Sequence, residues 1–316
     1  MIKWPAWAVV CLLVLTACSS SEEKKLPVMA IGTGNQTGTL FPVVKSFCDL
    51  LGTPSPCKMV PADSPARTLE NVQNGTVQLG IVRGDLLHQA WNGQAPFKGS
   101  LKRVRLLFAL NEEAITLVVS KKSGISSFQA IGGKRLNVGP EGSDNAKRVV
   151  ELLNGCKGLS SDLVLGRLEP HELPHALQSR TTDGYFEVMN HPNLALAQLA
   201  LAMRLEIVPI EGDCVAGLVK SKPYFDTTAI SGKMYRDAEQ DVTTVGIKTW
   251  VVANNEMDDE VVYRLVKKVF DNMETLRQSN PALHHLSPRK MLKAIDVPYH
   301  RGAMKYYRAK RWFKSS

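Results

Sequence analysis

A strand, a glycine-rich loop and a helix follow one another directly near the start of this chain. Residues 28–31 are an apolar run typical of a buried strand, and apolar residues at helical spacing occupy 40–51. The segment between them contains three glycines, which let backbone N–H groups approach a ligand closely, and the first turn of a helix favours negative charge. We therefore predict an anion-binding loop whose ligand residues are Gly34, Asn35, Thr37, Gly38 and Thr39.

The same arrangement recurs in the middle of the chain. A predicted strand at 135–138 meets the loop 139–144, and a helix follows with Ala146, Val149 and Leu152 on its buried face. Two α/β units of this kind bind ligands at the loop ends of their strands, in the crevice between them. The second set of predicted ligand residues is Gly142, Ser143, Asp144 and Asn145.

The rest of the chain alternates in the same way, which predicts a parallel sheet covered by helices. The further predicted strands are 58–60, 77–82, 104–110, 115–120, 163–165, 185–188, 206–210 and 241–253. The further predicted helices are 65–73, 85–91, 171–178, 191–203 and 258–278, and the basic, aromatic segment 305–314 is expected to be an amphipathic helix packed on the body. The strand at 241–253 returns the chain to its first half, so we predict lobe 1 from 26–116 plus 242–316 and lobe 2 from 117–241.

The N-terminal segment is typical of an export signal. Lys3 precedes an apolar run that is short for a bilayer, and the run ends in Leu15-Thr16-Ala17-Cys18. These four residues resemble a bacterial lipobox, so we predict a signal peptide over 1–18, lipidation of Cys18 and a polar tether over 19–25; an ordinary signal cleaved nearby is the alternative. Which membrane would hold the lipid stays open.

Composition and charge narrow the class of protein. The chain is 44% hydrophobic and 22% charged, which is ordinary for a globular protein, and its formal net charge is +9. A basic exported protein suggests an anionic ligand or a negatively charged membrane surface. Nucleic acid is not an expected partner, because the Lys and Arg residues are scattered and no groove-reading motif accompanies them.

Four cysteines remain once Cys11 is removed and Cys18 is lipidated. In an oxidising compartment they are expected to form disulfides, and three pairings are possible. Cys48 with Cys57 is our first choice because the two are close in sequence, which would leave Cys156 with Cys214.

No motif in the sequence points convincingly to catalysis, a metal or a cofactor. His171 and His175 match the spacing of a zinc-protease helix, but Pro174 between them disrupts a regular helix face. The glycines at 32, 34 and 38 fit a dinucleotide fingerprint poorly, since the third is displaced and no acidic residue follows at the right place. No nucleophile elbow or Cys/His pair is present. We predict a binding protein and not an enzyme.

Four further residues complete the predicted ligand site. Arg83 follows the strand 77–82 and offers a guanidinium fork suited to a carboxylate. Ser64 precedes a predicted helix start, Asp85 begins the predicted helix 85–91, and Tyr185 begins the predicted strand 185–188. An arginine at a strand end is otherwise a surface ion-pair residue about half the time.

Taken together, these strings resemble the TAXI family of solute receptors of tripartite ATP-independent periplasmic (TRAP) transporters. The resemblance covers nearly the whole mature chain, in segments 31–42, 71–85, 139–143, 191–193, 244–247 and 299–307, with Cys48 and Cys57. It implies a type II-like, two-lobed periplasmic-binding-protein (Venus flytrap) fold with crossover strands between the lobes. Ala62-Asp63-Ser64 and Arg83-Gly84-Asp85 depart from the Gly-Gly-Ser and Gln-Ser-Asp that the family usually shows.

The resemblance also implies a function. Family members mostly bind small carboxylates, including glutamate-like and oxo-acid molecules, and pass them to a membrane permease. We therefore expect a monomeric, membrane-tethered receptor that captures a small organic acid or amino acid for a TRAP-type permease, without a cofactor. The alternatives are an envelope lipoprotein of the same fold acting as a sensor or scaffold, and a hydrolase using His171 and His175.

Overall fold

A computed structural model describes residues 25–34, 41–52, 56–159, 162–236, 239–293 and 295–313. The described strands are β1 (Met29–Gly34), β2 (Cys57–Pro61), β3 (Leu79–Arg83), β4 (Val104–Ser120), β5 (Arg135–Asn137), β6 (Val164–Gly166), β7 (Gly184–Met189), β8 (Leu205–Val208), β9 (Phe225–Ile230) and β10 (Val242–Asn254).

The α-helices alternate with these strands. They are α1 (Phe41–Leu51), α2 (Pro65–Gln73), α3 (Gly84–Asn92), α4 (Asp144–Gly155), α5 (Leu173–Gln178), α6 (Leu194–Ala202), α7 (Asp213–Ser221), α8 (Asp259–Asp271), α9 (Met273–Ser279), α10 (Pro288–Met291) and α11 (Arg301–Ala309). The 3₁₀ turns are η1 (Lys121–Ser123), η2 (Phe128–Ile131), η3 (Lys157–Leu159), η4 (Pro170–Glu172) and η5 (Pro281–Leu283). None of the helices in the described segments is long and apolar enough to span a membrane.

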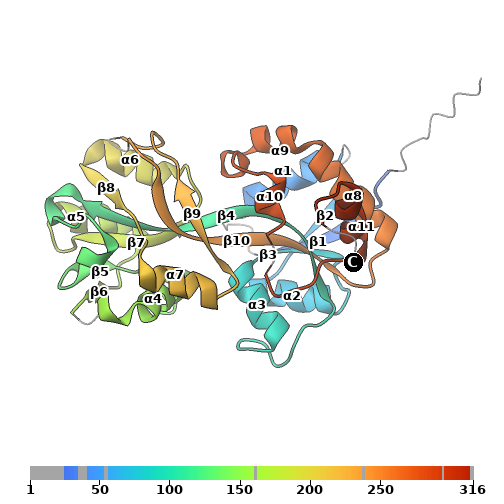
Figure 1. Cartoon of the computed structure of the whole chain (residues 1–316), viewed down its shortest axis with the longest axis horizontal. Helices are drawn as coiled ribbons and strands as arrows, with labels where there is room; N and C mark the ends of the chain where they lie inside the picture. The colour runs from blue at the N-terminus through green and yellow to red at the C-terminus, as the bar shows by residue number, and fades with distance from the viewer. Residues whose placement is uncertain are drawn as a thin grey trace, which may run out of the picture.

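Two long antiparallel strands, β4 and β10, run through both halves of the molecule and join them (Figure 1). The sheet order is β2-β1-β3-β10-β4-β7-β5-β6, with β8 on β4 and β9 on β10. In lobe 1, β1–β3 and α1–α3 pack with α8–α11 on one half of these strands. In lobe 2, β5–β9 and α4–α7 pack on the other half. Because both lobes share β4 and β10, the predicted boundaries at 116/117 and 241/242 stay a prediction.

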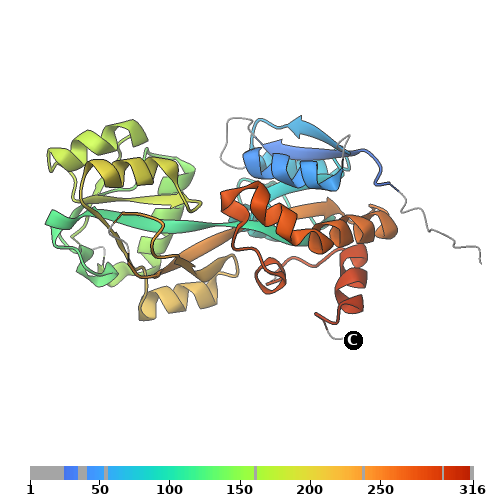
Figure 2. The same ribbon diagram turned by 90° about the horizontal axis from the view of Figure 1, so that it is seen from above.

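Local sequence explains where several elements begin and end. α2 spans the predicted residues 65–73: Ser64 caps it by accepting from the N–H of Arg67, and Pro65 supplies a first-turn residue without a donor. The C-terminal helix begins at Arg301, and its Tyr306 and Tyr307 are buried against the lobe 1 core, which confirms the predicted packing. Figure 2 shows this helix beside the long helices of lobe 1.

Three predictions about elements were wrong. The runs 104–110 and 115–120 form one strand, β4, because the polar residues between them lie where the strand crosses between lobes. The predicted helix 258–278 is broken into α8 and α9 at Asn272, whose side chain donates to the carbonyl of Lys268. The predicted helix 191–203 begins only at Leu194, because Asn193 caps it. In addition, α7 and β9 lie in a stretch to which we assigned no element.

Both disulfides follow the preferred pairing. Cys48 in α1 bonds Cys57 in β2, with a Cα–Cα distance of 5.6 Å. Cys156, just after α4, bonds Cys214 in α7, with a Cα–Cα distance of 5.2 Å. Each bridge lies within one lobe, so neither restricts movement of the lobes relative to one another.

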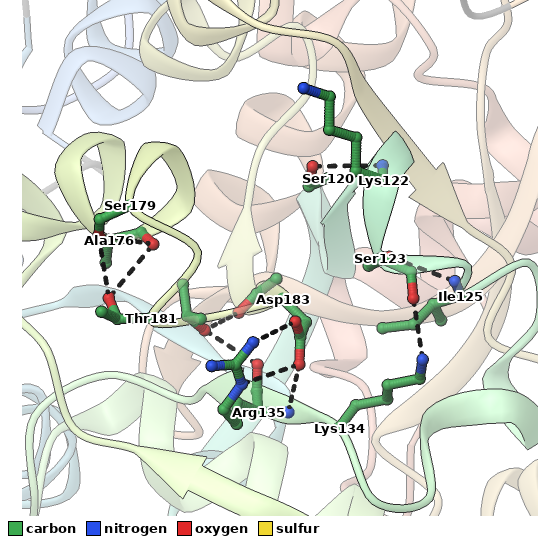
Figure 3. Close-up of polar contacts among 12 residues, drawn as sticks. Ser120, Lys122, Ser123, Ile125, Lys134, Arg135, Ala176, Ser179, Thr181 and Asp183 are labelled. Atoms are coloured by element: carbon green, nitrogen blue, oxygen red, sulfur yellow. Dashed lines mark hydrogen bonds and ion pairs between the residues drawn. The ribbon is translucent and has the colours of Figure 1, made fainter.

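An arginine–aspartate pair ties the outer end of lobe 2 together, as Figure 3 shows. Arg135 donates from Nη2 to Asp183 Oδ1 at 2.8 Å and from Nε to Asp183 Oδ2 at 3.2 Å. These hydrogen bonds hold the pKa of the Asp183 carboxyl below its usual value. The pair joins the starts of β5 and β7 and involves no residue of lobe 1, which makes it a useful reference for the arginines described below.

Candidate functional site

Arg83 is the last residue of β3, and its side chain reaches across the gap between the lobes. Its Nη2 donates to Oδ2 of Asp144 at 2.7 Å, and its Nη1 donates to Oε2 of Glu113 at 3.3 Å. Asp144 begins α4 in lobe 2, whereas Glu113 lies on the crossover strand β4. Arg83 therefore lies beside the second predicted loop. Three carboxylates of the chain surround its guanidinium, and the third is that of Asp85, whose Oδ1 is 3.7 Å from Arg83 Nε.

Arg148 is a second arginine at this position, and we did not predict it. It lies one turn into α4, is 6% exposed, and donates from Nη2 to Oδ2 of Asp85 at 2.6 Å. Its Nη1 also donates to the backbone carbonyl of Asp144. A signal was present in the sequence: Arg148 lies next to Val149 within the buried face of α4, and a charged residue there is almost always paired.

We call Arg83, Asp85, Glu113, Asp144 and Arg148 the cleft cluster. Two of its ion pairs cross between the lobes, because Arg83 and Asp85 belong to lobe 1 and their partners on α4 belong to lobe 2. With two cations and three carboxylates, the cluster has a formal charge of −1. Burial raises the pKa of Asp144, but the nearby charges of Arg148 and Arg83 outweigh that effect, so the pKa lies below its usual value. The carboxylate is therefore ionised at neutral pH.

The predicted serines both serve as helix caps. Ser64 Oγ accepts from the N–H of Arg67 at 3.2 Å, and Ser143 Oγ accepts from the N–H of Ala146 at 3.1 Å. Capping occupies the oxygen of each hydroxyl but leaves its hydrogen as a possible donor. The caps also fix where α2 and α4 begin. The two serines therefore marked the helix starts correctly, and their observed role is to cap the helices.

Two predicted ligand residues have other roles in this structure. The amide nitrogen of Asn145 donates to the carbonyls of Val138 and Phe186, both at 3.0 Å, and its oxygen accepts from the N–H of Val188 at 2.7 Å. No amide hydrogen is left for a ligand, so Asn145 ties its loop to β7. Tyr185 is 3% exposed and packs in the apolar core of lobe 2, where burial raises its pKa.

The remaining predicted residues are only partly described. Gly34 ends β1 and pairs with Pro61, and Gly142 has a left-handed backbone with φ 73°, which favours glycine. Asn35, Thr37, Gly38, Thr39 and the lipidation candidate Cys18 lie outside the described residues.

The histidine pair at 171 and 175 spans a 3₁₀ turn and the start of α5, as expected from Pro174, and both histidines are exposed. Within the described segments, no group of three or more His, Cys, Asp or Glu side chains is arranged to hold a metal ion. Nothing in this geometry favours the hydrolase alternative.

The fold defines the class of protein: it is the mixed α/β fold of type II periplasmic binding proteins. A TctC solute-binding protein from Polaromonas matches with a TM-score of 0.56 at 13% identity, covering 91% of this chain and 98% of that one. PhnD1 from Prochlorococcus marinus, solved with methylphosphonate, matches with a TM-score of 0.48 at 13% identity, covering 90% and 98%. The chain belongs to the NMT1-like family, whose model matches residues 31–310.

Proposed function

We propose that this protein is an extracytoplasmic receptor that captures a small organic acid or amino acid between its lobes and delivers it to a TRAP-type permease. The observation that carries the proposal is the geometry of Arg83. Its guanidinium lies at a strand end between the lobes and holds a carboxylate, that of Asp144, at 2.7 Å. A guanidinium fork matches a carboxylate in shape and charge, so the same position suits the carboxylate of a ligand.

Asp144 occupies the position at Arg83 for which the carboxylate of a ligand would compete. Its side chain is 58% exposed, whereas that of Arg83 is 18% exposed. Asp144 can therefore turn toward solvent, where water replaces Arg83 as its hydrogen-bond donor, while Arg83 pairs with the incoming carboxylate. Ligand binding would then replace an ion pair between the lobes with a ligand bridge, and the permease would recognise the closed state that the ligand favours.

The sequence supports the remaining parts of the proposal. The resemblance to TAXI receptors supports a TRAP-type permease as the partner, and the disulfides fit an oxidising compartment outside the cytoplasm. The lipobox-like residues 15–18 support a lipid anchor at Cys18. In this arrangement the receptor stays close to the membrane through the polar tether over 19–25.

One observation favours the alternative of a sensor or scaffold. The cleft cluster contains its own carboxylates, so both arginines are paired before any ligand arrives. A protein that closes on itself in this way could present a fixed surface to another envelope protein. Failure to bind any carboxylate, together with unchanged folding, would favour this alternative.

The experiment is a carboxylate binding panel on residues 26–316, using thermal shift and calorimetry. A true ligand at 100 times its Kd should stabilise the fold by about 2.7 kcal/mol, equivalent to about 5 °C or more in Tm. Arg83→Ala should abolish the shift. Arg135→Ala is the matched control, since it removes an aspartate-paired arginine within lobe 2 and should leave binding unchanged. No stabilisation by any carboxylate, or full binding by Arg83→Ala, would overturn the proposal.

A further inference from the structure

Most of the net positive charge of this chain is concentrated in a few segments of lobe 1. The segments 102–105 and 301–311 contain three and five basic residues and no acidic residue. The segment 256–271 contains three basic and five acidic residues, so the three segments together carry a formal charge of +6. The whole chain carries +9, which leaves the rest of it nearly balanced. A charge gathered in this way attracts partners of opposite sign.

These three segments lie side by side in the fold. The N–H of Asn255 donates to the carbonyl of Arg103 at 2.7 Å, and the N–H of His300 donates to the carbonyl of Leu106 at 2.9 Å. The helices α8 and α11 pack directly against one another. Figures 1 and 2 show α11, in red, near the end of lobe 1 farthest from lobe 2. The charge is therefore gathered at this end of the molecule.

The basic residues of α11 share one face of the helix. Arg301, Lys305 and Arg308 follow one another at helical spacing and are exposed, whereas the tyrosines of α11 face the core. Arg105 comes from β4 and lines the same pocket as Arg301. We call this surface the basic end of lobe 1. Its members are Lys102, Arg103, Arg105, Arg301, Lys305, Arg308, Lys310, Arg311 and Trp312.

The cations of the basic end are not neutralised by the rest of the chain. Four of the eight contact a carboxylate of the segment 256–271, in the pairs Arg103–Glu256, Arg301–Asp259, Lys305–Glu260 and Lys310–Asp271. Ion pairs at a surface are weak, so these four cations can exchange partners. The other four have no carboxylate partner within the described segments; they are Lys102, Arg105, Arg308 and Arg311.

An exposed tryptophan lies beside these charges. Trp312 directly follows Arg311, is 39% exposed, and stacks on the ring of Tyr307 with a centroid distance of 6.3 Å. Attraction to an acidic protein would require only the charges. Basic side chains together with an exposed indole are instead typical of surfaces at the boundary between membrane and water. The combination favours a lipid surface as the partner.

We propose that the basic end of lobe 1 docks on a membrane surface that contains anionic phospholipid. Its lysines and arginines pair with the lipid phosphates, and Trp312 enters the headgroup region. Docking in this way turns lobe 1 toward the membrane and lobe 2 away from it. The inference goes beyond the receptor function and does not depend on which ligand the cleft binds.

The N-terminal side of the described chain lies at the same end. Arg264 of α8 donates from Nη1 to the carbonyl of Lys25 at 3.2 Å. If Cys18 carries a lipid, as predicted, the residues 19–25 reach at most about 25 Å from it. An anchor there would keep α8 and the adjacent α11 close to the bilayer. Docking itself rests on the charges and on Trp312, so it can be tested without the anchor.

The test measures vesicle binding by residues 25–316, which contain every described strand and helix and lack the predicted lipidation site. Co-sedimentation compares vesicles of phosphatidylcholine alone with vesicles that also contain about 30 mol% phosphatidylglycerol, whose surface is negative. We expect saturable binding to the anionic vesicles only. Raising NaCl from about 0.1 M to about 1 M shortens the Debye length from about 10 Å to about 3 Å and should weaken this binding at least tenfold.

Two double variants of equal net charge locate the contact. Arg308→Glu with Arg311→Glu reverses two exposed cations of the basic end and should lower vesicle affinity at least tenfold. Arg180→Glu with Arg204→Glu is the matched control in lobe 2. All four arginines are exposed, and Arg180 and Arg311 share a left-handed backbone, with φ of 59° and 60°. The control should bind as tightly as the parent chain.

The fluorescence of Trp312 gives a second readout. Brominated phosphatidylglycerol should quench the tryptophan emission of the parent chain, and Trp312→Phe should lose most of this quenching. Three results would overturn the proposal: no binding to anionic vesicles, equal binding to neutral and anionic vesicles, or an equal loss of affinity in both double variants. The first of these would make an acidic protein surface the expected partner of the basic end.

Discussion

The two faces of the crossover strands solve the problem of buried charge in different ways. On one face, the cleft cluster pairs two arginines with carboxylates drawn from both lobes and from β4. On the other face, Glu112 accepts one hydrogen bond from Thr228 and keeps one buried oxygen without a hydrogen-bond partner among the described residues, beside a pocket whose lining is half polar and includes Lys248 and Lys290. A carboxylate ligand must compete with existing ion pairs on the first face, whereas the carboxylate on the second face has no arginine to pair with. Adjacent residues on one strand can thus have very different electrostatic surroundings.

The strongest test of this contrast removes Arg148. Arg148→Ala removes the closest cation to Asp85. Because Asp85 is only 8% exposed, its carboxylate would be left buried without this partner, and the free energy of unfolding should fall by about 3 kcal/mol. Urea denaturation monitored by circular dichroism measures the change. Arg135→Ala removes an exposed partner of Asp183 and should barely alter the midpoint. A loss below about 1 kcal/mol for Arg148→Ala would show that the cleft cluster does not stabilise the fold.

The next test concerns His191, which lines the pocket beside Glu112 on the other face of the crossover strands. Its Nε2 lies 2.9 Å from Thr116 Oγ1 and its Nδ1 lies 2.6 Å from Tyr235 OH, and burial lowers its pKa from 6.5 to about 4. The unfolded chain therefore binds an extra proton between these values, so this stability is complete above pH 6.5 and is lost as the pH falls to 4. The expected loss is about 2–3 kcal/mol.

The measurement is urea denaturation at a series of pH values between 7 and 4. His191→Gln should show a flatter dependence of unfolding free energy on pH over this range. His285→Gln is the comparison, because His285 lies at the same pocket but is exposed, and partial desolvation together with the charge of Lys290 also lowers its pKa. Identical pH profiles for the parent chain and His191→Gln would contradict the assignment.

The smallest expected effect comes from Asp144. Asp144→Asn removes the carboxylate that occupies Arg83, so it should tighten binding of the carboxylate ligand about tenfold, equivalent to about 1.4 kcal/mol. This prediction rests on the proposed function, and calorimetry with the ligand found in the panel measures it. Asp183→Asn is the control. Weaker binding by Asp144→Asn would indicate that Asp144 contacts the ligand directly.

Sequence reasoning located one side of the cleft well. The strand–loop–helix pattern placed Arg83 at a strand end and Asp144 at a helix start, and the structure brings these two residues together. It did not foresee that they bind each other, because pairing between residues 61 positions apart depends on how the lobes pack. The disulfide between Cys48 and Cys57, in contrast, could be predicted from the sequence, because a short sequence separation makes the contact local.

The misses have physical causes. Glu112 and Glu113 interrupt the apolar pattern, so they ended a predicted strand where the real strand crosses between lobes. Tyr185 was assigned to the ligand site, but its side chain packs in one apolar cluster of lobe 2, while that of Phe186, the next residue along β7, packs in another. Asn145 was chosen for its amide, which the structure uses to hold its own loop to β7.

The sequence by itself determined the local features of this protein: its alternation of strands and helices, the caps on α2 and α4 and the disulfide between Cys48 and Cys57. These depend on periodicity and on residues a few positions apart. Only the tertiary structure decided which charges meet, because Arg83, Arg148 and Glu112 acquire their partners, or lack them, through contacts between distant segments. The cleft cluster arises from that packing.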